Sequence, residues 1–206
     1  MEHALDGVDG AIPHSTTAHP VTGINNGKFA IWLFLASEVM LFGALFSSYV
    51  LIRVGSATFP HGRDVGLSVP LGTMNTLILI FSSVCVVFGW ASMKLGDAKK
   101  ARMWLGLTIL CAVTFLVVKY FEYMEKFHAG HFPWTNNFFA LYFTMTGLHA
   151  LHIIGGIVVM AYLIGPGSYL AKSNPEKYTN RLECTGLYWH FVDLVWIFLF
   201  PVMYLL

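Results

Sequence analysis

Five long apolar stretches, separated by short polar segments, dominate the chain. An α-helix needs about 20 apolar residues to cross a hydrocarbon core of about 30 Å, and each stretch meets that length. A transmembrane β-barrel would instead show segments of about ten residues with alternating hydrophobicity. The pattern therefore predicts an all-α, polytopic membrane protein, a bundle of five transmembrane helices. The predicted spans are about 29–52, 71–93, 102–124, 137–164 and 184–206.

Helix-breaking and polar residues mark the limits of these spans. Pro70 and Gly72 provide an entry to the second span, and the Gly-Pro-Gly sequence at residues 165–167 ends the fourth. Residues 1–27 contain three acids and no Lys or Arg, whereas a secretory signal would need a basic start and an apolar core. We therefore expect residues 1–27 to form an irregular cytoplasmic arm and residues 28–206 to form the five-helix membrane domain.

The composition agrees with a membrane protein. Only 11% of the residues are charged and 56% are hydrophobic, whereas a soluble domain carries about 25% charged residues. The formal net charge of +1 argues against a nucleic-acid partner. The cysteines Cys85, Cys111 and Cys184 are too few and too widely spaced for a disulfide framework or a zinc motif.

Lys and Arg are distributed unevenly between the two sets of span ends, and this asymmetry predicts the orientation. Cytoplasmic ends carry the excess of Lys and Arg, which places the N-terminus inside and the C-terminus outside. The richer set is Lys28, Lys94, Lys99, Lys100, Arg102, Lys172, Lys177 and Arg181. The poorer set is Arg53, Arg63, Lys119 and Lys126.

Ionisable residues inside the spans are the candidates for function, because charged groups are costly in a bilayer. Glu38 and Asp193 are each the tenth residue of their predicted span, which puts both about 14 Å from the inner end of two parallel helices. His190 lies one turn before Asp193, and His149 and His152 share a face of the fourth span. Glu122 lies near the outer end of the third.

Two interpretations of these residues are open. Glu38 is either a proton-handling carboxylate or a protonated, hydrogen-bonded acid that joins two helices. The histidines could ligate a metal or haem, but span four lacks the Glu-x-x-His repeats of a di-iron bundle. Neutral imidazoles hydrogen-bonded between helices are the favoured interpretation, because small residues beside them allow close helix packing. Those small residues are Gly43, Ser47, Gly147, Gly155 and Gly156.

Several motifs resemble subunit III of haem-copper terminal oxidases, the cytochrome c oxidase subunit 3 family. They occur in order in all five predicted spans, and together they are specific although each alone is modest. The resemblance covers the chain after about Lys28, and corresponds to a short bacterial form that lacks the first two helices of seven-helix members. The motifs are WLFLASEVMLF at residues 32–42, MNT at 74–76 with SS at 82–83, KYFEY at 119–123, TGLHALH at 146–152 and YWHFVDLVWIF at 188–198.

The resemblance implies a subunit without a catalytic centre, metal or redox cofactor of its own, in the multi-pass inner membrane of a bacterium. Haems and copper would belong to subunits I and II, and subunit I would be the main contact, with a small subunit IV as a further partner. The chain would bind structural phospholipids and support proton uptake. Glu38 matches the family's buried carboxylate facing subunit I, while Glu122, His149, His152, His190 and Asp193 match positions assigned to interhelical polar or lipid contacts.

Alternatives remain open at the level of sequence. A subunit of the same fold could serve a quinol oxidase or a nitric oxide reductase, because nothing in this chain contacts the electron donor. A stand-alone membrane metalloprotein would use His149, His152 and His190. A proton-coupled carrier is weaker, because the chain shows no internal repeat of half-chains with broken helices.

Overall fold

A computed structural model describes residues 25–56, 59–60, 62 and 65–205. Its five long helices are apolar enough to cross a membrane, so the prediction of an all-α bundle of five transmembrane helices is confirmed. Residues 1–24 of the expected N-terminal arm and Arg63 lie outside the described residues. The long helices are α1 (Asn26–Gly55), α2 (Val69–Lys94), α3 (Ala98–His128), α4 (Asn137–Ile164) and α6 (Pro175–Phe200).

Short elements complete the connections. The 3₁₀-helix η1 (Pro166–Tyr169) and the single turn α5 (Leu170–Ser173) join α4 to α6, and the π-helical turn η2 (Pro201–Leu205) extends α6. The long helices exceed the apolar stretches, because helices continue through the polar headgroup layer. Helix α6 therefore begins within the polar segment 172–183 that separates the last two apolar stretches.

Polar side chains cap the N-terminal ends of four of the long helices. The side chains of Asn25, Asp97, Asn136 and Asn174 each accept a hydrogen bond from a first-turn N–H, which satisfies donors that have no partner within the helix. The N–H of Lys100 donates to Asp97 at 3.0 Å, and this bond lowers the pKa of the Asp97 carboxyl from its usual value.

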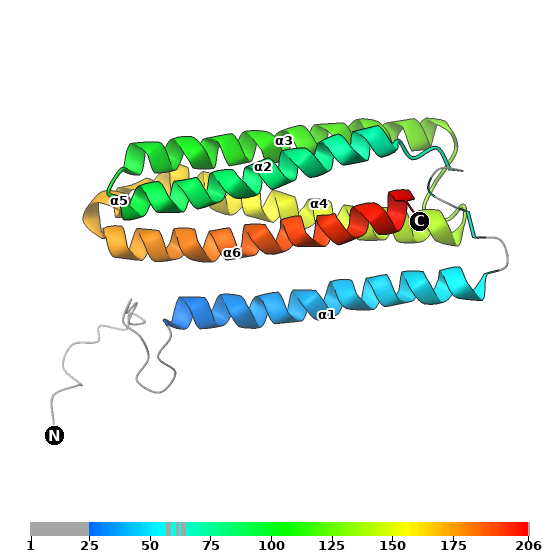
Figure 1. Cartoon of the computed structure of the whole chain (residues 1–206), viewed down its shortest axis with the longest axis horizontal. Helices are drawn as coiled ribbons and strands as arrows, with labels where there is room; N and C mark the ends of the chain where they lie inside the picture. Colours follow the sequence, from blue (N-terminus) through cyan, green and yellow to red (C-terminus); the bar gives the residue numbers. More distant parts are fainter. Residues whose placement is uncertain (1–24, 57–58, 61, 63–64, 206) are drawn as a thin grey trace, which may run out of the picture.

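The helices divide into a closely packed group of four, α2, α3, α4 and α6, and a peripheral α1 (Figure 1). In α1 only 11% of the apolar span is buried, against 44% in the last span. The buried residues of α1 are Leu35, Phe42 and Tyr49, which recur every seven residues and form one narrow stripe. We call the end where α1 and α6 begin, and α2 and α4 finish, the basic end.

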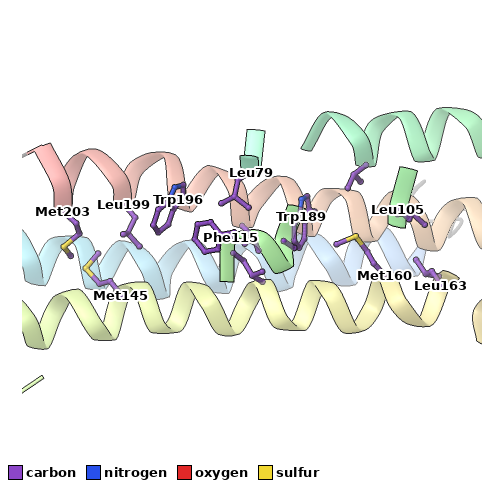
Figure 2. Packing of buried hydrophobic residues seen from close by; sticks show 14 of the residues in the cluster. Leu79, Leu105, Phe115, Met145, Met160, Leu163, Trp189, Trp196, Leu199 and Met203 are labelled. Atoms are coloured by element: carbon purple, nitrogen blue, oxygen red, sulfur yellow. The ribbon is translucent and has the colours of Figure 1, made fainter. Parts of the chain in front are cut away.

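Aromatic residues fill the core of the four-helix group. Figure 2 shows Phe115, Trp189 and Trp196 among aliphatic and methionine side chains. The rings of Phe115 and Trp196 meet edge to face with centroids 4.8 Å apart, an arrangement that aromatic quadrupoles favour. A Cβ added at Gly156 would lie 2.6 Å from the Trp189 ring, so this glycine is what allows α4 and α6 to approach.

The prediction that Gly43 and Ser47 of α1 allow close helix packing is wrong for contacts within the described part of this chain. A Cβ at Gly43 would meet nothing within 4 Å, and Ser47 is exposed. Both residues lie off the buried stripe of α1, so they do not mediate close packing within this chain. At Gly147 and Gly155 the nearest atoms are tyrosine hydroxyl oxygens, at 3.9 and 3.4 Å.

Candidate functional site

Glu38 of α1 meets His152 of α4 at the boundary between the peripheral helix and the core. Glu38 Oε2 lies 2.9 Å from His152 Nε2, and the two side chains are 13% and 14% exposed. The Phe42 ring packs edge-on against the imidazole with centroids 5.4 Å apart. On another side, the Tyr188 hydroxyl donates to the His152 carbonyl at 2.8 Å.

The second ring nitrogen of His152 fixes the proton count of this pair. His152 Nδ1 lies 2.8 Å from the Leu148 carbonyl oxygen, and a carbonyl only accepts, so Nδ1 carries a hydrogen. In a neutral imidazole Nε2 is then an acceptor, and Glu38 must be protonated to donate to it. The other possibility is an imidazolium beside a carboxylate. In both cases one proton lies between Glu38 and His152, and removal of it would abolish the hydrogen bond.

Two grooves flank this pair along α1. One, of about 550 Å³, lies towards the basic end and is lined by Phe34 of α1 and Arg181 of α6, among others. The second, of about 540 Å³, lies on the other side of Glu38 and is lined by Ala44 and Ser48 of α1 and by Gly147 of α4. Helix α1 is therefore held to α4 by a polar contact between two apolar grooves.

A second buried carboxylate lies in the core, near the end opposite to the basic end. Lys119 Nζ lies 3.2 Å from Glu122 Oε1, and the two side chains are 5% and 3% exposed. The hydroxyls of Tyr142 and Tyr204 each donate to the same carboxylate oxygen at 2.5 Å. Lys119 in turn donates to Tyr204 at 2.8 Å and to Tyr142 at 3.1 Å. This network joins α3 to α4 and to η2.

The remaining candidate residues occupy separate places. His149 is fully buried, and its ring lies 5.1 Å from the Trp196 ring and 5.6 Å from the Phe115 ring. Neither nitrogen of His149 has a hydrogen bond within the described residues. The prediction that this histidine is hydrogen-bonded between helices is therefore wrong, and its ring packs against aromatic rings instead. His190 Nδ1 is hydrogen-bonded to the Ser83 hydroxyl of α2.

Asp193 is 4% exposed. It faces α2, where the Ser83 hydroxyl lies within reach of its carboxyl, but by distance and angle neither carboxyl oxygen has a hydrogen bond in the described part of the chain. Asp193 and Glu38 therefore belong to different helix interfaces, although α1 and α6 are parallel. The lipid contact considered for Glu122 does not fit its burial.

The three histidines do not converge on one point. His152 is bonded to Glu38, His190 to Ser83, and His149 packs between aromatic rings. Among the described residues, no group of three or more His, Cys, Asp or Glu side chains could hold a metal ion.

Sequence reasoning did not identify the tyrosine partners of Glu122. Lys119 and Glu122 are three residues apart inside one span, and this spacing was a usable signal for an ion pair. Tyr142 and Tyr204 lie far away in the sequence, and no local pattern relates them to the ion pair.

Comparison with known proteins supports the family resemblance. The family model of "Cytochrome c oxidase subunit III" matches residues 10–206. The cytochrome c oxidase subunit 3 of Thermostichus vulcanus is 37% identical over 84% of this chain and 84% of its own length. That of Bacillus sp. (strain PS3) is 32% identical over 88% of this chain and 86% of its own length.

A relative whose name gives ubiquinol, and not cytochrome c, as the electron donor is comparably similar to this chain. The cytochrome bo(3) ubiquinol oxidase subunit 3 of Pseudomonas putida is 33% identical over 85% of this chain and 83% of its own length. The five apolar helices and these matches identify a multi-pass membrane protein that is a component of terminal oxidases. The chain belongs to the cytochrome c oxidase subunit III family.

Proposed function

We propose that this chain is the non-redox subunit III of a proton-pumping oxidase that reduces O₂ to water in a bacterial inner membrane. It packs against subunit I, holds structural phospholipids and supports proton uptake, while haems and copper reside in partner subunits. Subunit II and a small subunit IV complete the complex. The observation that carries the proposal is the contact of 2.9 Å between Glu38 and His152 at the edge of the core.

The position of this pair supports a coupling role. Glu38 lies on the least buried helix, next to two grooves, so a neighbouring subunit or a lipid can reach the surroundings of the pair. A protonatable group at such a boundary responds to the partner that covers it, because desolvation and nearby charges act on its proton. Glu122, by contrast, is enclosed within the chain and is assigned an interhelical role.

The orientation and the lipid contacts follow from the charged residues. Lys28, Lys94, Arg102 and Arg181 are among the basic residues that gather at the basic end, which supports a cytoplasmic N-terminus and an external C-terminus. Arg181 lines the groove of about 550 Å³ between α1, α4 and α6. Basic residues beside such grooves suit anionic headgroups, so this groove is the candidate lipid contact.

Substitution of Glu38 in the assembled oxidase tests the coupling role. Glu38→Ala removes both the proton and the bond, whereas Glu38→Gln keeps a hydrogen bond, because its amide N–H can donate to His152 Nε2. We expect both variants to keep normal haem spectra but to lose turnover or pumping progressively. Ser37→Ala, which removes a hydroxyl that donates to the Phe34 carbonyl of its own helix, is the matched control. A Glu38→Ala oxidase with full activity and full lifetime through many turnovers would refute the role.

The electron donor is a separate question. Named relatives include both cytochrome c and ubiquinol oxidases, and a nitric oxide reductase subunit of the same fold is a further alternative. Purification of the complex in mild detergent, followed by identification of the copurifying subunits and their haem and copper content, distinguishes them. Stoichiometric iron or copper in the isolated chain would instead favour a stand-alone metalloprotein.

A further inference from the structure

A third groove, between α2 and α6, leads from the basic end to His190, which lies one turn before the buried Asp193. Its volume is about 220 Å³, and α6 lines it with Glu183, Gly186, Leu187 and His190. These residues lie on one face of the helix, and Glu183 and His190 are about 10 Å apart along its axis. The groove therefore runs from the polar boundary of the bundle into the membrane-spanning region.

Most of this groove is lined by apolar side chains, and its polar groups lie at the outer end and at His190. Glu183 at its mouth forms an ion pair with Lys28 at 2.7 Å, and both side chains are about one-third exposed. The indole nitrogen of Trp90, which also lines the groove, is buried and has no hydrogen-bond acceptor in the described part of the chain. A buried donor of this kind is commonly satisfied by a water molecule.

At the inner end, the polar side chains of His190, Ser83 and Asp193 lie next to one another. His190 Nδ1 is hydrogen-bonded to the Ser83 hydroxyl, while His190 Nε2 makes no hydrogen bond to any residue that the structure describes. The Ser83 hydroxyl also lies within reach of the Asp193 carboxyl, one turn further along α6. An unpaired carboxylate is strongly disfavoured in such surroundings, and the neutral acid is the form that they favour.

We infer that His190, Ser83 and Asp193 form a proton-exchange site, in which the serine hydroxyl relays protons between the imidazole and the buried carboxyl. A proton from water in the groove binds His190 Nε2, and Nδ1–H passes its proton to Ser83 as the Ser83 hydroxyl proton moves to the Asp193 carboxylate. The imidazole is left as its neutral Nε2–H tautomer and the hydroxyl is restored, so one proton has moved from water to Asp193 and a hydroxide ion remains in the water. The reverse sequence releases it.

The surroundings of Asp193 restrict other routes. Trp189 Nε1 donates to the Ser82 hydroxyl at 3.0 Å, and Trp196 Nε1 donates to the Thr76 hydroxyl at 3.0 Å. These two tryptophans lie about one turn on either side of Asp193 along α6. Because each indole already uses its only polar hydrogen, the bonds close the interface above and below the acid. Ser83 is then the polar group that connects Asp193 to the groove.

Infrared spectroscopy of the purified, assembled oxidase tests the relay through hydrogen–deuterium exchange at Asp193. The C=O stretching band of the protonated acid is assigned by its loss in Asp193→Asn, and its shift after transfer to D₂O gives the exchange rate. We expect Ser83→Ala and His190→Phe each to slow this exchange by at least about tenfold. Ser83→Thr retains a hydroxyl and should keep the wild-type rate. Normal haem content of each variant verifies assembly.

Ser82→Ala is the matched control, because it removes the neighbouring hydroxyl, which serves Trp189 and not the relay. Unchanged exchange in both Ser83→Ala and His190→Phe would overturn the proposal, as would the absence of a protonated Asp193 band in the wild-type protein. Equal slowing by Ser82→Ala and Ser83→Ala would also overturn it, because the effect would then reflect general packing. None of these outcomes depends on the role proposed for Glu38.

Discussion

Glu38 and Glu122, which each have a basic partner within the helical bundle, differ in how the fold encloses them. Glu122 lies inside the four-helix core, and one of its oxygens receives hydrogen bonds from Lys119, Tyr142 and Tyr204. Glu38 lies on the peripheral helix, where its hydrogen-bond partner within the described residues is His152 at 2.9 Å. Three donors from three segments hold Glu122, whereas within the described residues a single hydrogen bond to His152 holds Glu38.

Glu122 is therefore an acid that stabilises the fold, whereas Glu38 makes a single hydrogen bond within the described residues, at the edge of the core. Breaking a buried ion pair is costly, because the remaining charge stays in a medium of low polarity. The Glu122 network therefore stabilises the junction of α3, α4 and η2. The Glu38 pair lies at the edge of the core, so loss of its hydrogen bond would leave the packing of the four-helix group intact. Loose packing around Glu38 is thus compatible with a role at an interface.

The largest expected effect comes from breaking the core ion pair. Lys119→Met leaves Glu122 buried without its cation and should destabilise the subunit by about 3–5 kcal/mol. Thermal unfolding in detergent and the yield of assembled complex measure this. Lys99→Met, at an exposed position, should change the stability by no more than about 0.5 kcal/mol. Equal stabilities of the two variants would show that the ion pair is not structural.

A double variant sharpens the same prediction. Lys119→Met combined with Glu122→Leu removes both charges and fills the space with apolar groups. It should be more stable than Lys119→Met alone, because no unpaired charge remains. If the double variant is as unstable as the sum of the two single changes, loss of packing and not loss of the charge pair is the cause.

The next effect concerns close helix contact. Gly156→Ala places a methyl group against the Trp189 ring and should cost about 1–3 kcal/mol through overpacking. Gly43→Ala on α1 meets nothing within 4 Å and should be neutral, or stabilising by up to about 1 kcal/mol from helix propensity. Thermal unfolding of the two variants compares them directly. A larger loss at Gly43 would indicate that a partner subunit packs on that face.

A smaller effect is expected for the bond between α1 and α4. Glu38→Ala should cost about 0.5–1.5 kcal/mol, the usual net value of a hydrogen bond, while Glu38→Gln should retain most of that stability. Amide hydrogen exchange of α1, measured against that of α3, reports whether the helix loosens. Destabilisation by Glu38→Ala as severe as that by Lys119→Met would remove the distinction between the two acids.

The smallest effect is expected at the ion pair between α1 and α6. Lys28 and Glu183 are partly exposed, and such pairs contribute about 0–1 kcal/mol. Lys28→Ala should therefore lower the thermal stability slightly at low salt and not at high salt, because ions screen exposed charges. A loss that persists at high salt would mean that the pair is more enclosed than its exposure indicates.

Much of the fold could be predicted from local pattern, because each membrane-spanning helix satisfies its own backbone hydrogen bonds. The apolar stretches therefore located the five helices, and the scarcity of charge singled out Glu38, Glu122 and Asp193. Their partners were not predictable in this way. His152 is 114 positions from Glu38 and Ser83 is 107 positions from His190, and these pairings depend on which helix faces which. The small residues of α1 misled for the same reason.

The sequence by itself determined that this chain spans a membrane with five helices, that it resembles oxidase subunit III, and that a few buried acids are exceptional. Those properties follow from composition and from residues close together in the chain. Only the tertiary structure decided that Glu38 meets His152 on a peripheral helix, and that Glu122 is enclosed by Lys119 and two tyrosines. Glu122 and Glu38 carry the same carboxyl group, but one lies in the four-helix core and the other at its edge. Helix packing decides this difference, because the number of donors around each carboxylate depends on which helices surround it.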